Sequence, residues 1–180
     1  MATTTETSVT TQVYRVYIKA TPQAIWDAIT SPEWTERYGY GGRGEYELRP
    51  GGAYTGYTSD AMKKAGAEKG YTVPDIAVDG EVIEADPPHK LVLTWRMLMD
   101  DAMRDEGFTR LTYEIEEGQS GVSKLTLIHD LAGAPSLALV VSGQLEDQGA
   151  GGGWSWVLSD LKSLLETGAP MDASNEMNQG

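Results

Sequence analysis

The stretch GWSWVLSDLKSLLETG, residues 153–168, decides the fold. Its apolar side chains recur at the spacing of an amphipathic helix, which places them on one face: Trp154, Val157, Leu158, Leu161, Leu164 and Leu165. The polar side chains fall on the opposite face: Ser155, Asp160, Lys162 and Glu166. Gly168 supplies the C-terminal stop of this helix. Because the apolar face is broad, the helix needs a large apolar partner.

Predicted strands supply that partner. Residues Val13–Lys19 alternate, with Tyr14, Val16 and Ile18 on one face. Six later segments have the same character and are bounded by turn residues: Glu45–Leu48, Gly52–Thr58, Ile76–Ala85, Leu91–Met97, Phe108–Glu116 and Val122–Leu131. Most connectors between them are of hairpin length, so neighbouring strands should pair antiparallel. The pattern predicts an α+β fold in which a curved antiparallel sheet of about seven strands wraps around the long C-terminal helix.

Shorter helices are expected between the strands. Thr21-Pro22 has the cap and first-turn residues of a helix start, and Ser31-Pro32 repeats that signal for a second short helix over Pro32–Arg37. Residues Ala134–Leu145 favour another helix, which Pro135 would open and Gly143 would end.

One segment interrupts the rhythm of strands. Residues Ser59–Pro74 contain a short helical pattern that Asp60 could cap. We interpret this segment as an inserted excursion or a lid.

Length and composition predict one domain and exclude several functions. The chain has 180 residues, of which 13–168 form the expected domain, and the polar segments 1–12 and 169–180 are predicted to be disordered tails. The absence of cysteine excludes disulfides, thiolate metal sites and thiol nucleophiles.

A net charge of −13 opposes binding to nucleic acid or to an anionic membrane. With neither a signal peptide nor a membrane span, we expect a cytoplasmic protein.

Several motifs in order resemble the START-like, helix-grip superfamily, also called SRPBCC, and within it the branch of heat-shock ATPase activator-like proteins. The similarity covers roughly residues 13–168 and rests on these segments: Ala20–Thr30, Pro50-Gly51-Gly52, Gly80-Glu81-Val82, Asp86–Trp95, Gly153-Trp154, Leu158, Leu161-Lys162 and Leu165-Glu166. The resemblance implies a helix-grip fold with a cavity between the sheet and the C-terminal helix.

The chain departs from the usual family pattern in two places, Ser59–Pro74 and the glycine-rich stretch Ala132–Gly153. In these features it is similar to bacterial proteins that protect producers of enediyne antibiotics such as calicheamicin. In that group the cavity is thought to capture the drug, whose radical attacks a glycine of the protein. No particular glycine of this chain can be matched to that role.

The candidate ligand-binding residues combine the predicted inward faces with the resemblance. They are Trp34, Tyr38, Trp95, Met97, Tyr113, Leu127, His129, Trp154, Leu158 and Leu161. An apolar member is more often a core residue than a ligand contact. Trp95, Tyr113 and His129 are stronger candidates, because an inward polar atom needs a hydrogen-bond partner. The composition of 5 Trp, 9 Tyr and 1 Phe also suits a lined cavity.

The two histidines, the acidic cluster and the glycine run are each interpreted as structural and not as catalytic or metal-binding. His129 could act as a general base, but no acid–base partner aligns with it, so a hydrogen-bonded core or rim histidine is favoured. His89 lies in a proline-rich turn and should be exposed. The acidic cluster is interpreted as a solvated loop, since it lacks the ligand order of a calcium loop: Asp100, Asp101, Asp105 and Glu106. Residues Gly149–Gly153 should form a hinge or gate beside the C-terminal helix.

Three functions follow. The leading hypothesis is non-catalytic binding of a hydrophobic or aromatic small molecule, with sequestration and self-resistance as its specialised form. The first alternative is a co-chaperone-like module that binds a heat-shock ATPase through its acidic surface. The second is a polyketide aromatase/cyclase with His129 as base and Tyr113 as the residue that orients it. No catalytic constellation, metal or cofactor is expected.

Overall fold

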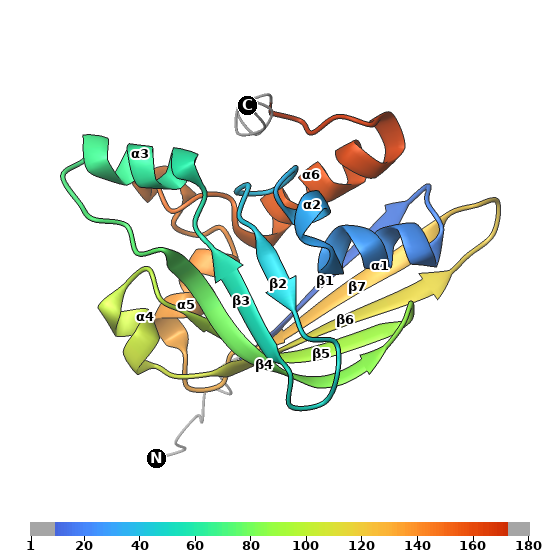
Figure 1. The fold of residues 1–180 in the computed structure, drawn as a ribbon, viewed down its shortest axis with the longest axis horizontal. Coiled ribbons are helices and arrows are strands. Elements are labelled where there is room, and N and C mark those ends of the chain that lie inside the picture. Colours follow the sequence, from blue (N-terminus) through green and yellow to red (C-terminus); the bar gives the residue numbers. More distant parts are fainter. Residues whose placement is uncertain (1–9, 173–180) are drawn as a thin grey trace, which may run out of the picture.

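The computed structural model describes residues 10–172 and confirms the predicted helix-grip fold. Seven antiparallel strands form one curved sheet in the order β1-β7-β6-β5-β4-β3-β2 (Figure 1). The strands are β1 (Thr11–Ile18), β2 (Gly44–Tyr46), β3 (Ala53–Tyr57), β4 (Ile76–Asp86), β5 (Lys90–Met97), β6 (Thr109–Glu117) and β7 (Ser123–Asp130).

The helices α1, α2 and α6 lie on the same face of this sheet (Figure 1). The helical segments are α1 (Pro22–Thr30), α2 (Pro32–Thr35), α3 (Asp60–Glu68), α4 (Asp101–Asp105), α5 (Pro135–Val141), the 3₁₀ turn η1 (Glu146–Gln148) and α6 (Gly153–Thr167). The two short helices after the first strand and the helix opened by Pro135 are therefore confirmed. Among residues 10–172, no helix has both the length and the apolar character needed to span a bilayer.

Helix caps explain two differences from the sequence predictions. Ser59, not Asp60, caps α3, and its hydroxyl accepts a hydrogen bond from the Met62 N–H at 3.2 Å. The acidic cluster is a short helix and not a loop, because the Asp100 carboxylate accepts the N–H groups of Ala102 and Met103. In the described part of the chain, no group of three or more carboxylates or imidazoles gathers as a metal site would require.

Element ends also differ from the predictions. Strand β1 begins at Thr11, two residues inside the segment predicted to be a disordered tail, because Thr11 and Gln12 pair with the end of β7. Helix α2 ends at Thr35 and not at Arg37. Residues 1–9 and 173–180 of the two predicted tails lie outside the described residues.

Asp160 is buried, contrary to the prediction from the helical pattern. The helical pattern placed it on the polar face of α6, yet the residue is 0% exposed. Its Oδ2 accepts the Gly39 N–H at 2.8 Å and its Oδ1 accepts the Met171 N–H at 2.6 Å. One carboxylate in α6 therefore holds the loop after α2 and the segment after α6.

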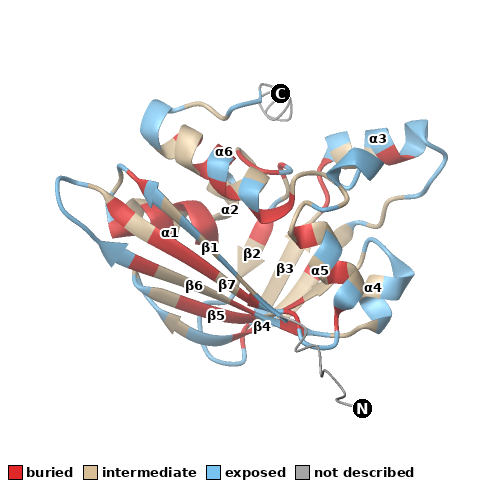
Figure 2. Cartoon of the chain, turned by 180° about the vertical axis from the view of Figure 1, so that it is seen from behind, coloured by how far each residue is buried: buried red, intermediate tan, exposed pale blue. Residues whose placement is uncertain are grey.

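Burial is uneven across the sheet. Figure 2 shows buried residues concentrated in β5, β6, β7 and α1, whereas α3 is mostly exposed. Ile18, Leu125 and Leu127 are 0% exposed on the β1–β7 side, and Leu161 of α6 is 1% exposed. The residues of β3 are exposed or only half-buried. The packed core thus occupies one half of the sheet, and the β2–β4 half is less densely packed.

We expect the substitution Asp160→Ala to lower the free energy of unfolding by about 3 kcal/mol, because it removes the acceptor of two charge-assisted hydrogen bonds. Urea denaturation measures this loss. Ser159→Ala changes an exposed neighbour in the same helix and is the matched control. Equal stability of the two variants would show that the buried carboxylate contributes little.

Candidate ligand-binding cavity

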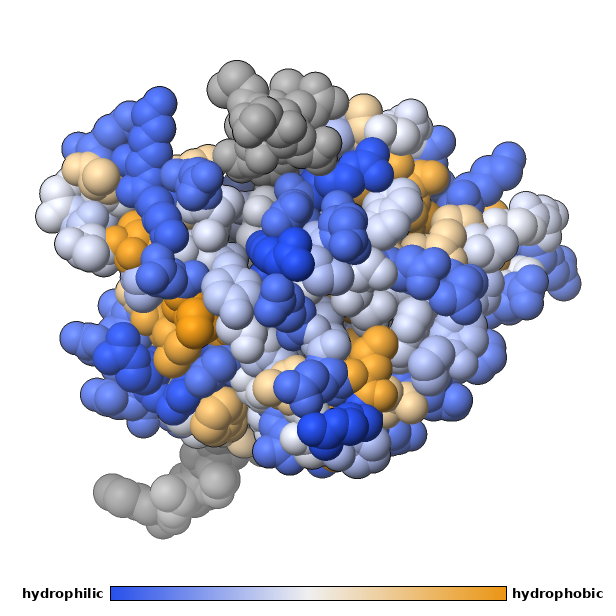
Figure 3. Space-filling model, viewed as in Figure 1, coloured by the Kyte–Doolittle hydropathy of each residue, from blue (hydrophilic) through white to orange (hydrophobic). Residues whose placement is uncertain are grey.

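The under-packed half of the molecule contains a cavity of about 590 Å³. Its walls come from the loop after α2, strands β2 to β6, helix α3, the end of α5, the glycine segment 149–153 and the start of α6. The volume lies within the roughly 300–1,000 Å³ range of small-molecule sites. Space-filling Figure 3 shows apolar surface between the positions of α3 and α4, bordered by hydrophilic residues.

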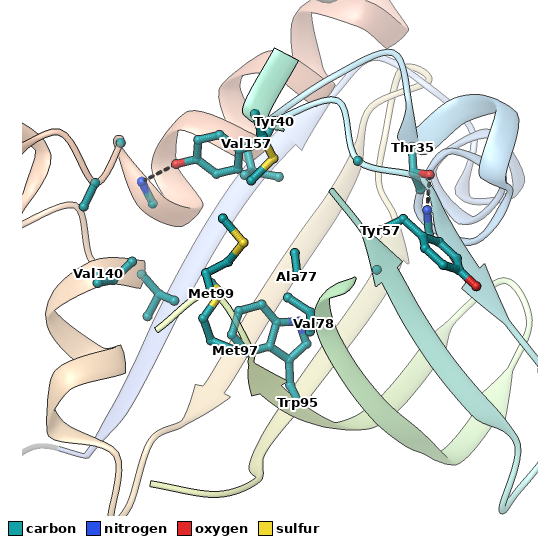
Figure 4. Close-up of a pocket in the computed structure, with 18 of the residues that line it drawn as sticks. Thr35, Tyr40, Tyr57, Ala77, Val78, Trp95, Met97, Met99, Val140 and Val157 are labelled. Carbon is teal, nitrogen blue, oxygen red and sulfur yellow. Dashed lines mark hydrogen bonds between the residues drawn. The ribbon is translucent and has the colours of Figure 1, made fainter. Parts of the chain in front are cut away.

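Aromatic and thioether side chains dominate the lining. Seven of the nine tyrosines take part: Tyr38, Tyr40, Tyr46, Tyr54, Tyr57, Tyr71 and Tyr113. Trp95 and Trp154 join them, as do four methionines: Met62, Met97, Met99 and Met103. In Figure 4, Met97 and Met99 lie between Val140 and Ala77. Such a lining offers flat ring faces and adaptable sulfur contacts to an apolar ligand.

Four tyrosines form the inner part of the lining. Tyr46 and Tyr54 face each other across the β2–β3 hairpin, and their rings stack with centroids 4.5 Å apart. Burial raises the pKa of both hydroxyls, and it raises those of Tyr38 and Tyr113 in the same way. All four hydroxyls therefore stay neutral at physiological pH.

Tyr40 connects the loop after α2 to the glycine segment. Its hydroxyl accepts the Gly153 N–H at 3.1 Å (Figure 4). Gly153 has a φ of +67°, and a Cβ at this position would lie 2.1 Å from the Val141 carbonyl oxygen. Only glycine permits this close approach between the end of α5 and the start of α6. The segment predicted as a hinge thus has a packing role, and its movement stays a prediction.

The charges of the lining are all positive. Arg43 and Lys69 contribute to it, whereas no Asp or Glu does, although the chain has 27 such residues. Arg43 already pairs with Glu45 at 2.9 Å and with Glu36 at 3.6 Å. Any bound molecule would therefore meet ring faces, hydroxyls, an arginine that is already paired and the cation Lys69.

His129 does not line the cavity and cannot serve as the base proposed for a cyclase. Its Nδ1 accepts the Trp154 indole N–H at 3.1 Å, and its Nε2 lies 2.8 Å from the Thr109 hydroxyl. That hydroxyl donates its own proton to the Trp95 carbonyl, so Nε2 must carry a hydrogen. Burial lowers the pKa of His129 to about 4. The imidazole is a neutral, fully hydrogen-bonded core group.

Of the ten predicted ligand-binding residues, the structure brings five together around the cavity: Tyr38, Trp95, Met97, Tyr113 and Trp154. Leu127, Leu158 and Leu161 instead fill the packed core with His129. Trp34 lies under the Arg37 guanidinium, 4.7 Å from its ring centroid, and is not in the lining. The alternation of each strand identified the inward face, but not how far along that face the core ends.

Most of the tyrosines in the lining were not among the residues predicted from the sequence. A signal for two of them existed, because Tyr46 and Tyr54 lie equally far in sequence from Pro50 in the turn and therefore pair in the hairpin. Residues of α3 gave no such signal, since local patterns do not say over which face an excursion folds.

This fold and this site define a helix-grip protein with a partly open cavity beside the C-terminal helix. Residues 19–166 match the family described as Activator of Hsp90 ATPase homolog 1-like protein, and the chain belongs to this family. No curated protein matches the sequence.

Solved structures with low sequence identity share the fold. CalU16 from Micromonospora echinospora is 19% identical, with 92% of this chain and 71% of that chain covered and a TM-score of 0.60. MLL2253 from Mesorhizobium loti is 19% identical, with 86% of this chain and 96% of that chain covered and a TM-score of 0.61. DynU16, described as a putative protein in the dynemicin biosynthetic locus, is 20% identical. The match covers 89% of this chain and 49% of that chain, with a TM-score of 0.58.

We expect His129 to make stability depend on pH. Its pKa is about 4 in the folded chain and about 6.5 in the unfolded chain, so only the unfolded state gains a proton between these values. The free energy of unfolding should fall by about 3 kcal/mol as the pH drops from 6.5 to 4. His129→Gln should lack this part of the decline, whereas the exposed His89→Gln should keep it. Identical pH profiles for the two variants would contradict the assignment.

Proposed function

We propose that the protein binds a hydrophobic or aromatic small molecule in the cavity between the sheet and the C-terminal helix. The observation that carries this proposal is a 590 Å³ space lined by tyrosine, tryptophan and methionine. Burying so many large side chains against one another would stabilise the chain further, yet they surround a space. The arrangement suits a ligand that supplies the missing contacts.

We infer that this binding is non-catalytic. The ionisable side chains of the lining are tyrosines, Arg43 and Lys69, so no imidazole or carboxylate is present there to act as a general base near neutral pH. The nearest histidine has both ring nitrogens engaged.

Sequestration of an enediyne antibiotic, with self-resistance as the result, is the narrower form of the proposal. Two observations support it: a cavity large enough for a polycyclic molecule, and a fold shared with a protein described as belonging to the dynemicin biosynthetic locus. The excursion that carries α3 would enclose the drug, since Met62, Lys69 and Tyr71 of this segment contribute to the lining. A cytoplasmic location would fit such a role.

Interaction with a heat-shock ATPase is the second candidate, and the family to which the chain belongs favours it. A closed, fully packed interior would have strengthened this alternative, whereas the interior contains a cavity. Increased turnover of a purified heat-shock ATPase on addition of the protein would make this the preferred function.

Filling part of the cavity should weaken binding. Ala77 lies on β4 and faces the interior in Figure 4, so the ring of Ala77→Phe would occupy part of the space. We expect at least tenfold weaker binding of the neutral fluorescent probe N-phenyl-1-naphthylamine, measured by fluorescence titration.

Ile83→Phe is the matched control for this test. Ile83 lies on the same strand but is 37% exposed and is not part of the lining. This variant should bind the probe as the unmodified protein does. If the unmodified protein does not bind the probe, or if Ala77→Phe binds it equally well, the proposed site is wrong.

Enediyne capture has its own test. The unmodified protein and Ile83→Phe should reduce nicking of plasmid DNA by thiol-activated calicheamicin, whereas Ala77→Phe should not. Gel electrophoresis of the plasmid measures the difference. Equal nicking with and without the unmodified protein would remove calicheamicin-type drugs as ligands but leave cavity binding intact.

A further inference from the structure

The hydroxyl of Tyr113 is the inner polar group that the protein leaves unused. Tyr113 lies on β6, with Leu91 of β5 and Leu127 of β7 as its cross-strand neighbours, and its side chain contributes to the cavity lining. Within residues 10–172, no hydrogen bond is found for this hydroxyl. Every fully buried side-chain polar atom in that range has a hydrogen-bond partner, so an oxygen without a partner cannot be fully buried. The Tyr113 hydroxyl therefore faces the open space of the cavity.

The other tyrosines of the lining differ from Tyr113 in this respect. Tyr38 donates to the Ala28 carbonyl at 2.9 Å, Tyr40 accepts from Gly153, and Tyr57 bonds to Glu45. Tyr46 and Tyr54 bond to each other. Tyr71 is 63% exposed and can bond to water. Because burial raises the pKa of Tyr113, its hydroxyl keeps its proton and is available to donate it to a ligand acceptor.

Lys69 places a positive charge at the border of the same cavity. Its Nζ lies 3.7 Å from the position that a Cβ on Gly149 would take, so it lies where the end of α3 meets the glycine segment. No carboxylate of the described residues pairs with it, in contrast to Lys63 within α3, which pairs with Asp75 at 2.7 Å. Lys69 is thus a cation without a counter-ion beside an apolar space.

A cationic ligand would suit this cavity poorly. Aromatic rings can bind cations, but Lys69 would repel one and no carboxylate contributes to the lining, while Arg43 is already paired with Glu36 and Glu45. An anionic ligand would instead be attracted by Lys69 and would meet no carboxylate in the lining. The chain has a net charge of −13, so a lining free of carboxylates spares an anion from short-range repulsion.

Resting on the proposed function, we propose that the ligand is an aromatic carbonyl compound that bears an acidic group. Its carbonyl oxygen accepts the Tyr113 hydroxyl proton, its rings lie among the tyrosine, tryptophan and methionine side chains, and its anionic group lies near Lys69. The carbonyl contact depends on Tyr113 and the contact of the anionic group depends on Lys69, so each contact can be tested with its own variant.

Three matched tricyclic probes separate the two contacts. 9-Fluorenone-2-carboxylate has both the ring carbonyl and the acid, fluorene-2-carboxylate lacks the carbonyl, and 9-fluorenone-2-carboxamide lacks the charge. Each is titrated into the protein at low salt, and binding is followed by quenching of tryptophan fluorescence, since Trp95 and Trp154 contribute to the lining. The variants are Tyr113→Phe and Lys69→Gln.

We expect Tyr113→Phe to weaken binding of both fluorenones about fivefold and to leave fluorene-2-carboxylate unchanged. Lys69→Gln should weaken both carboxylates about threefold and leave the carboxamide unchanged, and added salt should reduce this difference. The controls Tyr17→Phe and Lys64→Gln change exposed residues outside the lining and should bind all three probes normally.

The outcomes also distinguish this inference from the proposed function. If the three probes bind equally well and neither variant changes their affinities, the cavity binds aromatic molecules but the inferred ligand class is wrong. If no probe binds, and N-phenyl-1-naphthylamine does not bind either, the proposed function itself fails.

Discussion

A helix about 10 Å across cannot cover seven strands spaced about 4.8 Å apart, and this mismatch determines how the rest of the molecule is built. Helix α6 buries its apolar face mainly against the β1 side of the sheet, where Leu125, Leu127 and Leu161 are almost completely excluded from solvent. The strands on the other side need a different cover. Short helices, a long excursion and a glycine segment provide it only in part, and the remaining space is the cavity.

The side chains on the two halves of the sheet differ because their surroundings differ. Aliphatic residues fill the half under α6, since they can pack tightly without polar atoms. The half under α3 carries tyrosines, whose hydroxyls can reach backbone groups, water or a ligand. His129 lies at the boundary, where Thr109 and Trp154 satisfy both of its ring nitrogens. The cavity therefore begins where apolar packing against the helix stops.

Much of this architecture could be predicted from the sequence, because strand alternation and the helical period of residues 153–168 are local signals. Asp160 could not be assigned correctly, because its two partners, Gly39 and Met171, are brought to it only by the tertiary structure. The same reason explains why Leu158 was expected in the cavity and Tyr71 was not. A periodic pattern tells which face of an element points inward, but not what lies opposite that face.

The contact between Gly39 and Asp160 joins residues that are 121 positions apart. Strand β1 likewise pairs with β7, more than a hundred residues later in the chain. Contacts of such long range form slowly, because most of the chain must be ordered before they can close. During synthesis on a ribosome, the loop that carries Tyr38 and Tyr40 can therefore reach its place in the cavity wall only after α6 has emerged. The nascent chain would expose its tyrosine-rich sheet face until then.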